Sequence, residues 1–415
     1  MINFIELLGI KYTVWPEMLA WPYLMLQGWL PYSDIGIAHN PLLLVFLSAF
    51  YKIFGLGVMQ LKIFTWILIA LNVYLVYFVV KKFWHRHIAY FSAVLYLLLV
   101  IVYEGNGLWF DIALTPFSIL LFYFLKSKKY FWLGVFFGLG FLTKQTFIYF
   151  AVPVGIIMFL ENKLKISRYI NFFIGIGGTF ALFAIALYLF GILDDYYYWA
   201  VEFGILYLPQ AKGQISLPGF NQFIFSFAPF LILSISKNYL LISFAIAGLL
   251  GIYPRFELFH FQPSLPFLSI LLSLVILKNK IKFIRIIAFI FITIFLALGI
   301  YRQLGTNTRF YEQDVQEVVS ILKSYDVEKI YVVNYWDSIY SLSSTIPATR
   351  PLIPYIPWYL KDAEKRQIMD DLTITPPDVV VVKYLDSLEF VELKEFIYRY
   401  YDCRLVMNNV KICKK

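Results

Sequence analysis

Residues 60–80, QLKIFTWILIALNVYLVYFVV, contain a single charged side chain, and residues 81–86 directly after them read KKFWHR. A helix needs about 20 mostly apolar residues to cross the hydrocarbon core of a bilayer. A group of basic residues at the end of such a run is typical of a cytoplasmic loop. This stretch therefore predicts a membrane-spanning helix and the direction in which the chain crosses.

The composition of the whole chain agrees with this interpretation. Of its 415 residues, 61% are hydrophobic, only 15% are charged and 42 are phenylalanine. Soluble globular proteins have about 45–50% apolar and about 25% charged residues, and disordered chains combine low hydrophobicity with high net charge. Both classes are excluded, and we expect a bilayer to surround much of the chain.

The net charge of +9 is unevenly distributed. Residues 1–300 contain 20 Lys and Arg against 10 Asp and Glu, whereas residues 301–415 contain 15 against 16. A nucleic-acid-binding protein would gather its basic residues on a soluble face, but here the excess lies between apolar runs. We therefore expect no nucleic-acid partner, a membrane domain over residues 1–300 and a small α/β domain over residues 301–415.

Ten apolar runs are candidate spans of an α-helical polytopic membrane protein. They are residues 60–80, 87–103, 109–125, 130–143, 147–160, 170–193, 224–236, 239–253, 264–277 and 283–300. With alternating directions, the loops on one side and Arg285 hold 14 of the 20 basic residues, which marks that side as cytoplasmic. Eight of the ten acidic residues and the C-terminal domain then lie outside the cytoplasm. We infer a multi-pass protein of the cell membrane.

The segment before the first span, residues 11–59, is predicted to be an outer loop. Its stretch GWLPYSDIGIAHNP (28–41) interrupts an apolar region with prolines and polar residues. Because broken backbone within a bilayer needs protein or water around it, two helices along the outer surface, about residues 17–28 and 41–54, fit better than a span. Residues 1–10 are apolar but too short to cross; either they lie at the interface or they follow an earlier helix that this sequence lacks.

The C-terminal domain has the pattern of a covered sheet. Predicted strands are IYVVN (330–334), DVVVV (378–382) and LVMNNVKIC (405–413), and predicted helices are 310–325, 360–371 and 386–400. Its cysteines, Cys403 and Cys413, either form a disulfide outside the cytoplasm or remain two buried thiols. No phosphate loop or nucleophile motif is present, so we expect a structural or acceptor-recognition role.

Glu17 and Asp34 in the first outer loop are the candidate catalytic residues. A carboxylate at the membrane surface can act as general base toward an acceptor hydroxyl, while the second orients a group or balances charge. His39 could hydrogen-bond a phosphate or the acceptor. The alternative is a surface loop whose charges only face water.

A late outer loop, YPRFELFH (253–260), contains candidate substrate-binding residues. Arg255 is the only arginine expected on the outer side of the membrane domain, and a guanidinium is suited to bidentate phosphate binding. Glu257 and His260 lie near it in sequence. The alternative for Arg255 is that it only reaches the lipid headgroups from a helix end.

Two further outer turns supply candidate substrate-binding residues. Lys144, in FLTKQTF (141–147), could meet a lipid phosphate, although reaching the headgroups is again an alternative. Glu104 and Asp111, in YEGNGLWFD (103–111), could line the same cavity or simply face water. We expect no metal site and no cofactor, because the carboxylates are separated and no ligand cluster appears; this does not exclude a divalent metal.

These stretches resemble the GT-C superfamily of integral-membrane glycosyltransferases, in particular the protein O-mannosyltransferases, the aminoarabinose transferases and their prokaryotic relatives. Pro16-Glu17 resembles the acidic motif that opens the first outer loop of that family. GWLPYSD (28–34) and HNPL (39–42) resemble its G-x-x-x-Y-x-D and H-x-P-L stretches. FLTKQT (141–146) is similar to its Leu-x-Lys-Gly or Leu-x-Lys-Gln turn, and YPRFELFH, with Pro266 downstream, resembles its late outer loop.

The resemblance implies a GT-C-like fold with a soluble outer domain, and it places the catalytic carboxylate at Glu17. Many members have a paired Asp-Glu where this chain has Pro16-Glu17, so Glu17 either acts alone or shares the work with Asp34. A first membrane helix should precede the loop, which agrees with the suspected missing start.

The predicted function is an inverting glycosyltransferase that moves a hexosyl or pentosyl group from a polyprenyl-phosphate donor to an acceptor hydroxyl outside the cytoplasm. The acceptor would be a glycan, lipid or protein, and Arg255 and Lys144 would stabilise the leaving phosphate. The alternatives are a transporter or a lipid-linked-sugar flippase, although such proteins place ionisable groups near the bilayer midplane. A third reading is a non-catalytic scaffold that presents the outer domain.

Overall fold

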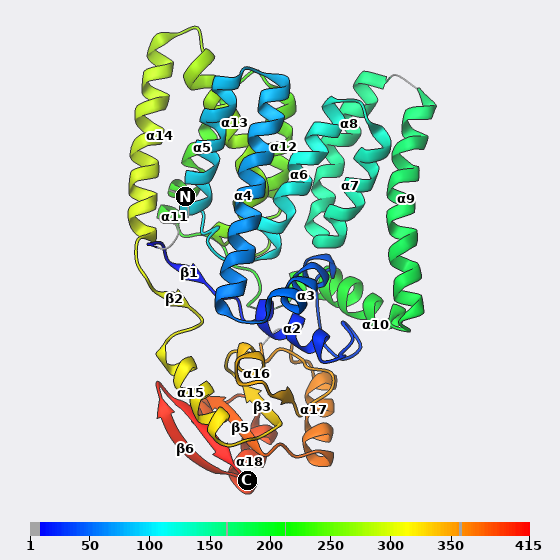
Figure 1. The fold of residues 1–415 in the computed structure, drawn as a ribbon, viewed down its shortest axis with the longest axis vertical. Coiled ribbons are helices and arrows are strands. Elements are labelled where there is room, and N and C mark those ends of the chain that lie inside the picture. The colour runs from blue at the N-terminus through cyan, green and yellow to red at the C-terminus, as the bar shows by residue number, and fades with distance from the viewer. Residues whose placement is uncertain (1–8, 163–164, 212, 357–358) are drawn as a thin grey trace.

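The computed structural model describes residues 9–162, 165–211, 213–356 and 359–415. Helices standing side by side form a bundle, and the C-terminal domain lies beneath one end of it (Figure 1). This is the predicted architecture, a polytopic helical membrane fold with a small mixed sheet. The prediction for residues 1–10 falls mostly on residues 1–8, which lie outside the described residues.

All ten predicted spans are helical. They correspond to α4 (Val58–Phe83), α5 (Arg86–Val102), α6 (Phe110–Lys126), α7 (Tyr130–Thr143), α8 (Ala151–Asn162), α9 (Ile166–Leu189), α11 (Phe220–Phe227), α12 (Tyr239–Leu250), α13 (Leu265–Lys278) and α14 (Lys282–Gln303). Short 3₁₀ segments extend α8, α11 and α13; they are Gln145–Phe150, Ala228–Ser234 and Leu258–Ser264. Among the described residues, four helical segments are long and apolar enough to cross a membrane, namely α4, α9, α14 and Leu258–Lys278. The other spans are shorter apolar helices.

The two ends of the bundle differ in charge. The turns α4–α5, α6–α7 and α13–α14 lie at the end far from the C-terminal domain, as the predicted topology requires (Figure 1). Basic side chains there rest on aromatic rings: the Nζ of Lys126 lies 3.8 Å from the ring centre of Trp84 and 4.6 Å from that of Phe83. Such contacts suit residues that anchor helix ends at a membrane surface.

Two surface helices cross the opposite end of the bundle, also as predicted. These are α2 (Glu17–Leu26) and α3 (Leu42–Phe54), which lie between the bundle and the C-terminal domain (Figure 1). The hydroxyl of Tyr51 on α3 donates to the carbonyl of Met18 on α2 at 3.1 Å. Between the helices, the Tyr32 hydroxyl donates to the carbonyl of His39 at 2.9 Å and closes the connecting loop.

The C-terminal domain contains a five-stranded sheet in the order β4-β3-β5-β7-β6. Its strands are β3 (Lys329–Val333), β4 (Ile346–Pro347), β5 (Val379–Lys383), β6 (Asp402–Met407) and β7 (Val410–Lys414). β3, β4 and β5 are parallel, whereas β7 runs antiparallel to both β5 and β6. Its helices are α15 (Gln313–Ser324), α16 (Ser338–Ser343), α17 (Asp362–Ile374) and α18 (Val391–Tyr400). Buried valines in β3 and β5 explain the predicted strands.

The last predicted strand, residues 405–413, is instead part of the β6–β7 hairpin. Asn408 and Asn409 turn the chain with φ angles of 48° and 62°. A two-residue hairpin turn of type I′ needs positive φ at both positions, and asparagine tolerates it better than most residues. The Asn-Asn pair was the signal that the single-strand prediction overlooked.

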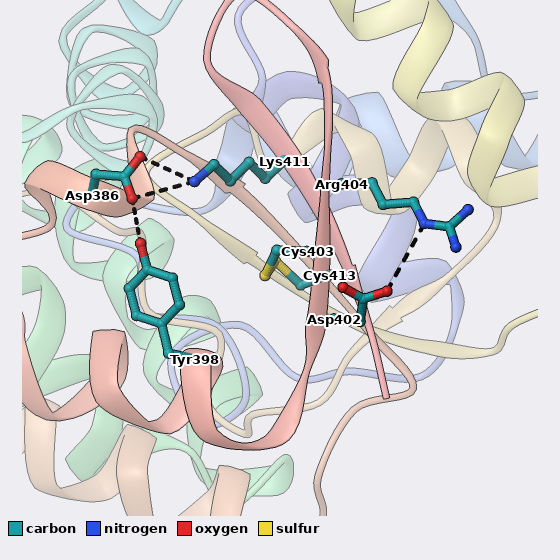
Figure 2. The surroundings of a disulfide bond; sticks show 7 residues. All are labelled: Asp386, Tyr398, Asp402, Cys403, Arg404, Lys411 and Cys413. Atoms are coloured by element: carbon teal, nitrogen blue, oxygen red, sulfur yellow. Dashed lines mark hydrogen bonds and ion pairs between the residues drawn. A yellow bond between two sulfur atoms is a disulfide. The ribbon is translucent and has the colours of Figure 1, made fainter.

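The two cysteines form a disulfide across this hairpin (Figure 2). Cys403 on β6 lies opposite Cys413 on β7. Nearby, Lys411 on β7 forms an ion pair with Asp386 at 3.0 Å, and the Tyr398 hydroxyl of α18 also donates to Asp386 (Figure 2). Of the two alternatives for the cysteines, the structure contains the disulfide.

A short pair of strands joins the start of the chain to the start of the C-terminal domain. β1 (Tyr12–Thr13) pairs in parallel with β2 (Thr308–Arg309). The Tyr12 hydroxyl also bonds Thr65 on α4 at 2.8 Å. The segment leading into α2 and the segment leaving α14 are thereby held against the same end of the bundle.

Glycines allow the close approach of α7 and α9. A Cβ on Gly175 of α9 would lie 2.2 Å from the carbonyl oxygen of Phe131, and one on Gly134 of α7 would lie 2.0 Å from that of Phe172. No side chain fits at these distances. By contrast, a Cβ on Gly178, also on α9, would meet nothing within 4 Å.

We therefore predict that Gly175→Leu lowers the midpoint of thermal unfolding in detergent, because overpacking typically costs about 1–3 kcal/mol. Gly178→Leu on the same helix is the matched control and should leave the midpoint unchanged or raise it. Equal midpoints for the two variants would contradict the packing described here.

Candidate functional site

Glu17 lies at the end of the bundle next to the C-terminal domain, as the first residue of α2. A carboxylate is favoured there by the partial positive charge of the helix N-terminus. Its Oε2 atom is buried and has no hydrogen-bond partner among the described residues. Burial raises the pKa of Glu17, against a smaller opposing effect of the Arg255 charge. The side chain is thus a carboxylate with a raised proton affinity.

An aromatic wall stands beside this helix start. The ring of Trp15 lies 4.7 Å from Trp109, 5.0 Å from Phe259 and 5.2 Å from Phe310, measured between ring centres. The guanidinium of Arg309 on β2 lies 4.6 Å from the Phe310 ring and 5.7 Å from the Trp15 ring. Sequence analysis did not select these residues, which come from four distant segments.

Three of the predicted substrate-binding residues meet in one buried cluster. The Nζ of Lys144, after α7, lies 2.6 Å from Oδ2 of Asp111 in the first turn of α6. The Nδ1 of His260, in the 3₁₀ segment before α13, lies 2.9 Å from the same oxygen. All three are buried. Asp111 balances the charge of Lys144, so this lysine is a compensated cation rather than an exposed phosphate ligand.

His39 packs against the same region. Its ring centre lies 4.5 Å from that of Phe110 and 6.0 Å from that of Trp109. Burial, and then the nearby charge of Lys144, lower the pKa of His39 to about 3, although Asp111 opposes the shift. The imidazole is therefore neutral at physiological pH and can act through hydrogen bonds but not through charge.

Arg255, Glu257 and Glu104 lie on the rim of the same end of the bundle. The Nε of Arg255 lies 3.6 Å from Oε1 of Glu257, and both side chains are partly exposed. Backbone bonds with Ser216 hold this loop, including one of 2.8 Å from the amide of Phe256. Burial raises the pKa of Glu104, with the Arg309 charge lowering it and Glu257 raising it. The rim thus combines acids with two arginines.

A polar pocket of about 730 Å³ opens at this rim. It lies between β1, β2 and the ends of α5, α14 and α15. Its lining is rich in amides and charges and includes Lys11, Glu104, Asn106, Gln303, Arg309 and Gln313.

An apolar groove of about 390 Å³ lies among α3, α4, α6 and α7. Its lining includes Phe46, Phe50, Leu68, Leu71, Ala113 and Thr143. Thr143 of this lining directly precedes Lys144, so one end of the groove lies next to the segment that carries this lysine.

Asp34 has partners different from those of Glu17. Its two carboxylate oxygens accept bonds of 2.7 and 2.8 Å from the guanidinium of Arg350 in the C-terminal domain, and Oδ2 also accepts the amide of Leu30 at 2.7 Å. The hydrogen bonds from Arg350 lower the pKa of Asp34. Backbone bonds between Leu352 and residues 34 and 36 reinforce the contact. Both oxygens are engaged, so this geometry suits fastening the two domains rather than taking a proton.

Asp337 is a buried acid at the site that sequence analysis did not select. It follows β3 and directly precedes α16, which packs against α2. Its side chain is only 8% exposed. The available signal was its place just after the buried strand, because ligand sites of α/β sheets lie at the carboxyl ends of parallel strands. In the described part of the chain, no group of three or more His, Cys, Asp or Glu side chains is arranged to hold a metal ion.

Comparison with known proteins gives two kinds of likeness. Residues 38–189 match the model of the dolichyl-phosphate-mannose-protein mannosyltransferase family. The fold is similar to the crystal structure of apo ArnT from Cupriavidus metallidurans, with a TM-score of 0.65, 11% identity and coverage of 99% of this chain and 95% of that one. Comparison with the sequences of curated proteins gave no match.

Two further solved structures are similar. ArnT from Cupriavidus metallidurans bound to undecaprenyl phosphate has a TM-score of 0.63, 10% identity and coverage of 99% of this chain and 96% of that one. The oligosaccharyltransferase of Archaeoglobus fulgidus has a TM-score of 0.48, 12% identity and coverage of 85% of this chain and 62% of that one. The family match and the ArnT-like fold confirm the predicted resemblance to the GT-C glycosyltransferases.

The ion pair between Asp34 and Arg350 gives a prediction about docking. A double-mutant cycle with Asp34→Asn and Arg350→Gln should show a coupling of about 1 kcal/mol, since paired charges at a partly exposed contact contribute roughly that amount. Hydrogen exchange of the segment around Leu352 should rise equally in either single variant. Additive effects would contradict the fastening role.

The pH dependence of this contact has a defined sign. Because the folded pKa of Asp34 is below the ordinary value of 3.8, its contribution is complete above that pH. This contribution to stability is lost as the pH falls through the lowered pKa that Asp34 has in the folded protein. The docking of the C-terminal domain in Asp34→Asn should therefore show less change on acidification than in the wild type.

Proposed function

We propose that this GT-C-like membrane protein is a glycosyltransferase that moves a sugar from a polyprenyl-phosphate donor to an acceptor hydroxyl. The observation that carries the proposal is the buried Glu17 carboxylate at the outer end of the bundle, beside an aromatic wall. Its place at the end of the bundle, rather than mid-bilayer, favours surface chemistry over transport.

We propose that the apolar groove holds the isoprenoid chain of the donor. Its lining is almost wholly apolar, and one end of it lies next to the segment that carries Lys144. An ArnT of the same fold has been crystallised with undecaprenyl phosphate, which supports a donor of this class. Arg255 on the rim has a partly exposed guanidinium that suits the donor phosphate.

The polar pocket suits the acceptor. Amide side chains such as Gln303 and Gln313 can both donate and accept hydrogen bonds, which is what hydroxyl-rich groups require. Arg309 lies in this lining and also on the Trp15 ring, so the pocket and the Glu17 site share a wall. We propose an acceptor with a polar, hydroxyl-bearing part.

In the proposed reaction, Glu17 takes the proton of the acceptor hydroxyl. The hydroxyl oxygen attacks the anomeric carbon as the bond from that carbon to the phosphate oxygen breaks, and the configuration inverts. The electron pair leaves on the lipid phosphate, whose charge Arg255 stabilises. A raised pKa makes Glu17 a stronger base near neutral pH. Asp34 keeps its structural role in this scheme.

We further propose that the end of the bundle with the basic turns faces the cytoplasm. The positive-inside rule then places Glu17, both pockets' mouths and the C-terminal domain outside it. The disulfide between Cys403 and Cys413 agrees with an oxidising compartment for this domain.

Glu17→Gln should lower sugar transfer by about 10²–10⁴-fold, the usual contribution of a general base. The measurement is incorporation of labelled sugar by proteoliposomes supplied with a panel of undecaprenyl-phosphate sugars and envelope extracts as acceptors. Glu392→Gln, an exposed position on α18, is the control at matched expression. Wild-type transfer by Glu17→Gln, or uptake of the label without covalent transfer, would reject the assignment.

Filling the apolar groove should weaken binding of the donor lipid. Leu71→Trp on α4 adds bulk to the groove lining and should reduce undecaprenyl phosphate binding about tenfold, a loss of about 1.4 kcal/mol. Native mass spectrometry can measure this. Leu298→Trp on lipid-facing α14 lies outside the groove lining and should bind normally. Equal weakening in both variants would refute a role for the groove.

A further inference from the structure

We propose that Asp337 is a positioning residue of this active site: a second carboxyl group, supplied by the C-terminal domain, that lies across the α2–α16 interface from Glu17 and whose ionisation is coupled to that of Glu17. The inference rests on the proposed role of Glu17 as the base. It makes the C-terminal domain part of the catalytic apparatus rather than an appended module.

The packing of α16 on α2 brings the two acids to one interface (Figure 1). Asp337 directly precedes the first residue of α16, and Glu17 is the first residue of α2. Aromatic rings connect their sequence neighbours: Trp336 lies 4.6 Å from Phe310, and Phe310 lies 5.2 Å from Trp15. The wall beside Glu17 therefore continues to Asp337.

Capping does not account for the aspartate. Asp337 stands at the N-cap of α16, where a carboxylate usually accepts a backbone hydrogen bond, but its side chain makes no capping bond. It is 8% exposed, and no ion pair in the described part of the chain includes it. Burying a carboxylate without a cation costs stability, and such costs are typical of functional sites.

The topology of the sheet gives an independent indication. In the sheet, β4 lies on one side of β3 and β5 lies on the other side. The chain runs from β3 to β4 and then crosses over to β5, so the order of the strands reverses at β3. Ligands of open α/β sheets bind beyond the carboxyl ends of the strands at such a point. Asp337 lies just beyond the carboxyl end of β3, and that end faces α2 (Figure 1).

The charges around the pair predict how it titrates. From α2, Glu17 faces Asp337; from the sheet and α16, Tyr331 and Tyr340 face it with phenol groups whose own pKa values are raised by burial. On the Glu17 side, Arg255 partly balances the charge. Burial, and then repulsion by Glu17, raise the pKa of Asp337 to about 8. Asp337 therefore keeps its proton at neutral pH, and the repulsion couples its ionisation to that of Glu17.

The test is an infrared pH titration of protonated carboxyl groups in the full-length protein in nanodiscs. We expect a carboxyl group that titrates near pH 8, is lost in Asp337→Asn and moves to lower pH in Glu17→Gln, because the repelling charge is gone. Asp378→Asn, an exposed position before β5, is the matched control and should retain the signal. A titration that Glu17→Gln leaves unchanged, or no such carboxyl group, would overturn the proposal.

Stability and activity give two further readouts. A raised folded pKa means that the wild type loses stability as the pH rises from 3.8 to about 8, so the unfolding midpoint of Asp337→Asn should increasingly exceed that of the wild type over this range. In the transfer assay, Asp337→Asn should leave the acidic limb of the pH profile in place and abolish any change of rate near pH 8, because Asp337 carries no charge below that pH. If sugar transfer is normal but the titration of Asp337 does not depend on Glu17, only the role proposed for Asp337 is overturned. A coupled pair in a protein that transfers no sugar overturns the proposed function and with it the positioning role.

Discussion

The docking of the C-terminal domain on surface helix α2 is the contact on which the site depends. The Asp34–Arg350 ion pair and the backbone bonds of Leu352 hold the first outer loop to the domain. On the far side of the interface, the Tyr198 hydroxyl donates to Glu364 on α17 at 2.6 Å. With both sides fixed, α16 covers α2 and encloses Glu17 and Asp337. Without docking, Glu17 would face water and have an ordinary proton affinity.

The bilayer explains the rest of the arrangement. A membrane excludes charge from the middle of the bundle, so ionisable groups collect at its ends, where one end carries basic turns and the other the acids. Where charges do enter the bundle, they neutralise one another, as Lys144 and Asp111 do at 2.6 Å. A lipid-linked substrate matches this division, because the protein offers both an apolar groove and a separate pocket lined by amide and charged side chains.

Much of the fold could be predicted because its signals are local. Span length, basic turns and the interrupted stretch at 28–41 identified the helices of the bundle and both surface helices. The roles of the site residues are harder to predict, because partners far apart in sequence decide them. Asp34 meets Arg350 across 316 positions, and no local pattern encodes that pairing. For Asp337 the sequence offers only its place after a buried strand, because its proposed partner, Glu17, lies on a helix near the other end of the chain.

In the proposed mechanism, a donor lipid lies in the groove with its phosphate beside Glu17. A cryo-electron microscopy structure of the full chain with undecaprenyl phosphate would show where the lipid binds. We expect density for the isoprenoid chain along Leu71 and Phe50, with the phosphate at the end of the bundle next to the C-terminal domain, within reach of Arg255 and Glu17. Lipid density elsewhere, with the groove filled by protein side chains or the phosphate at the basic end of the bundle, would contradict it.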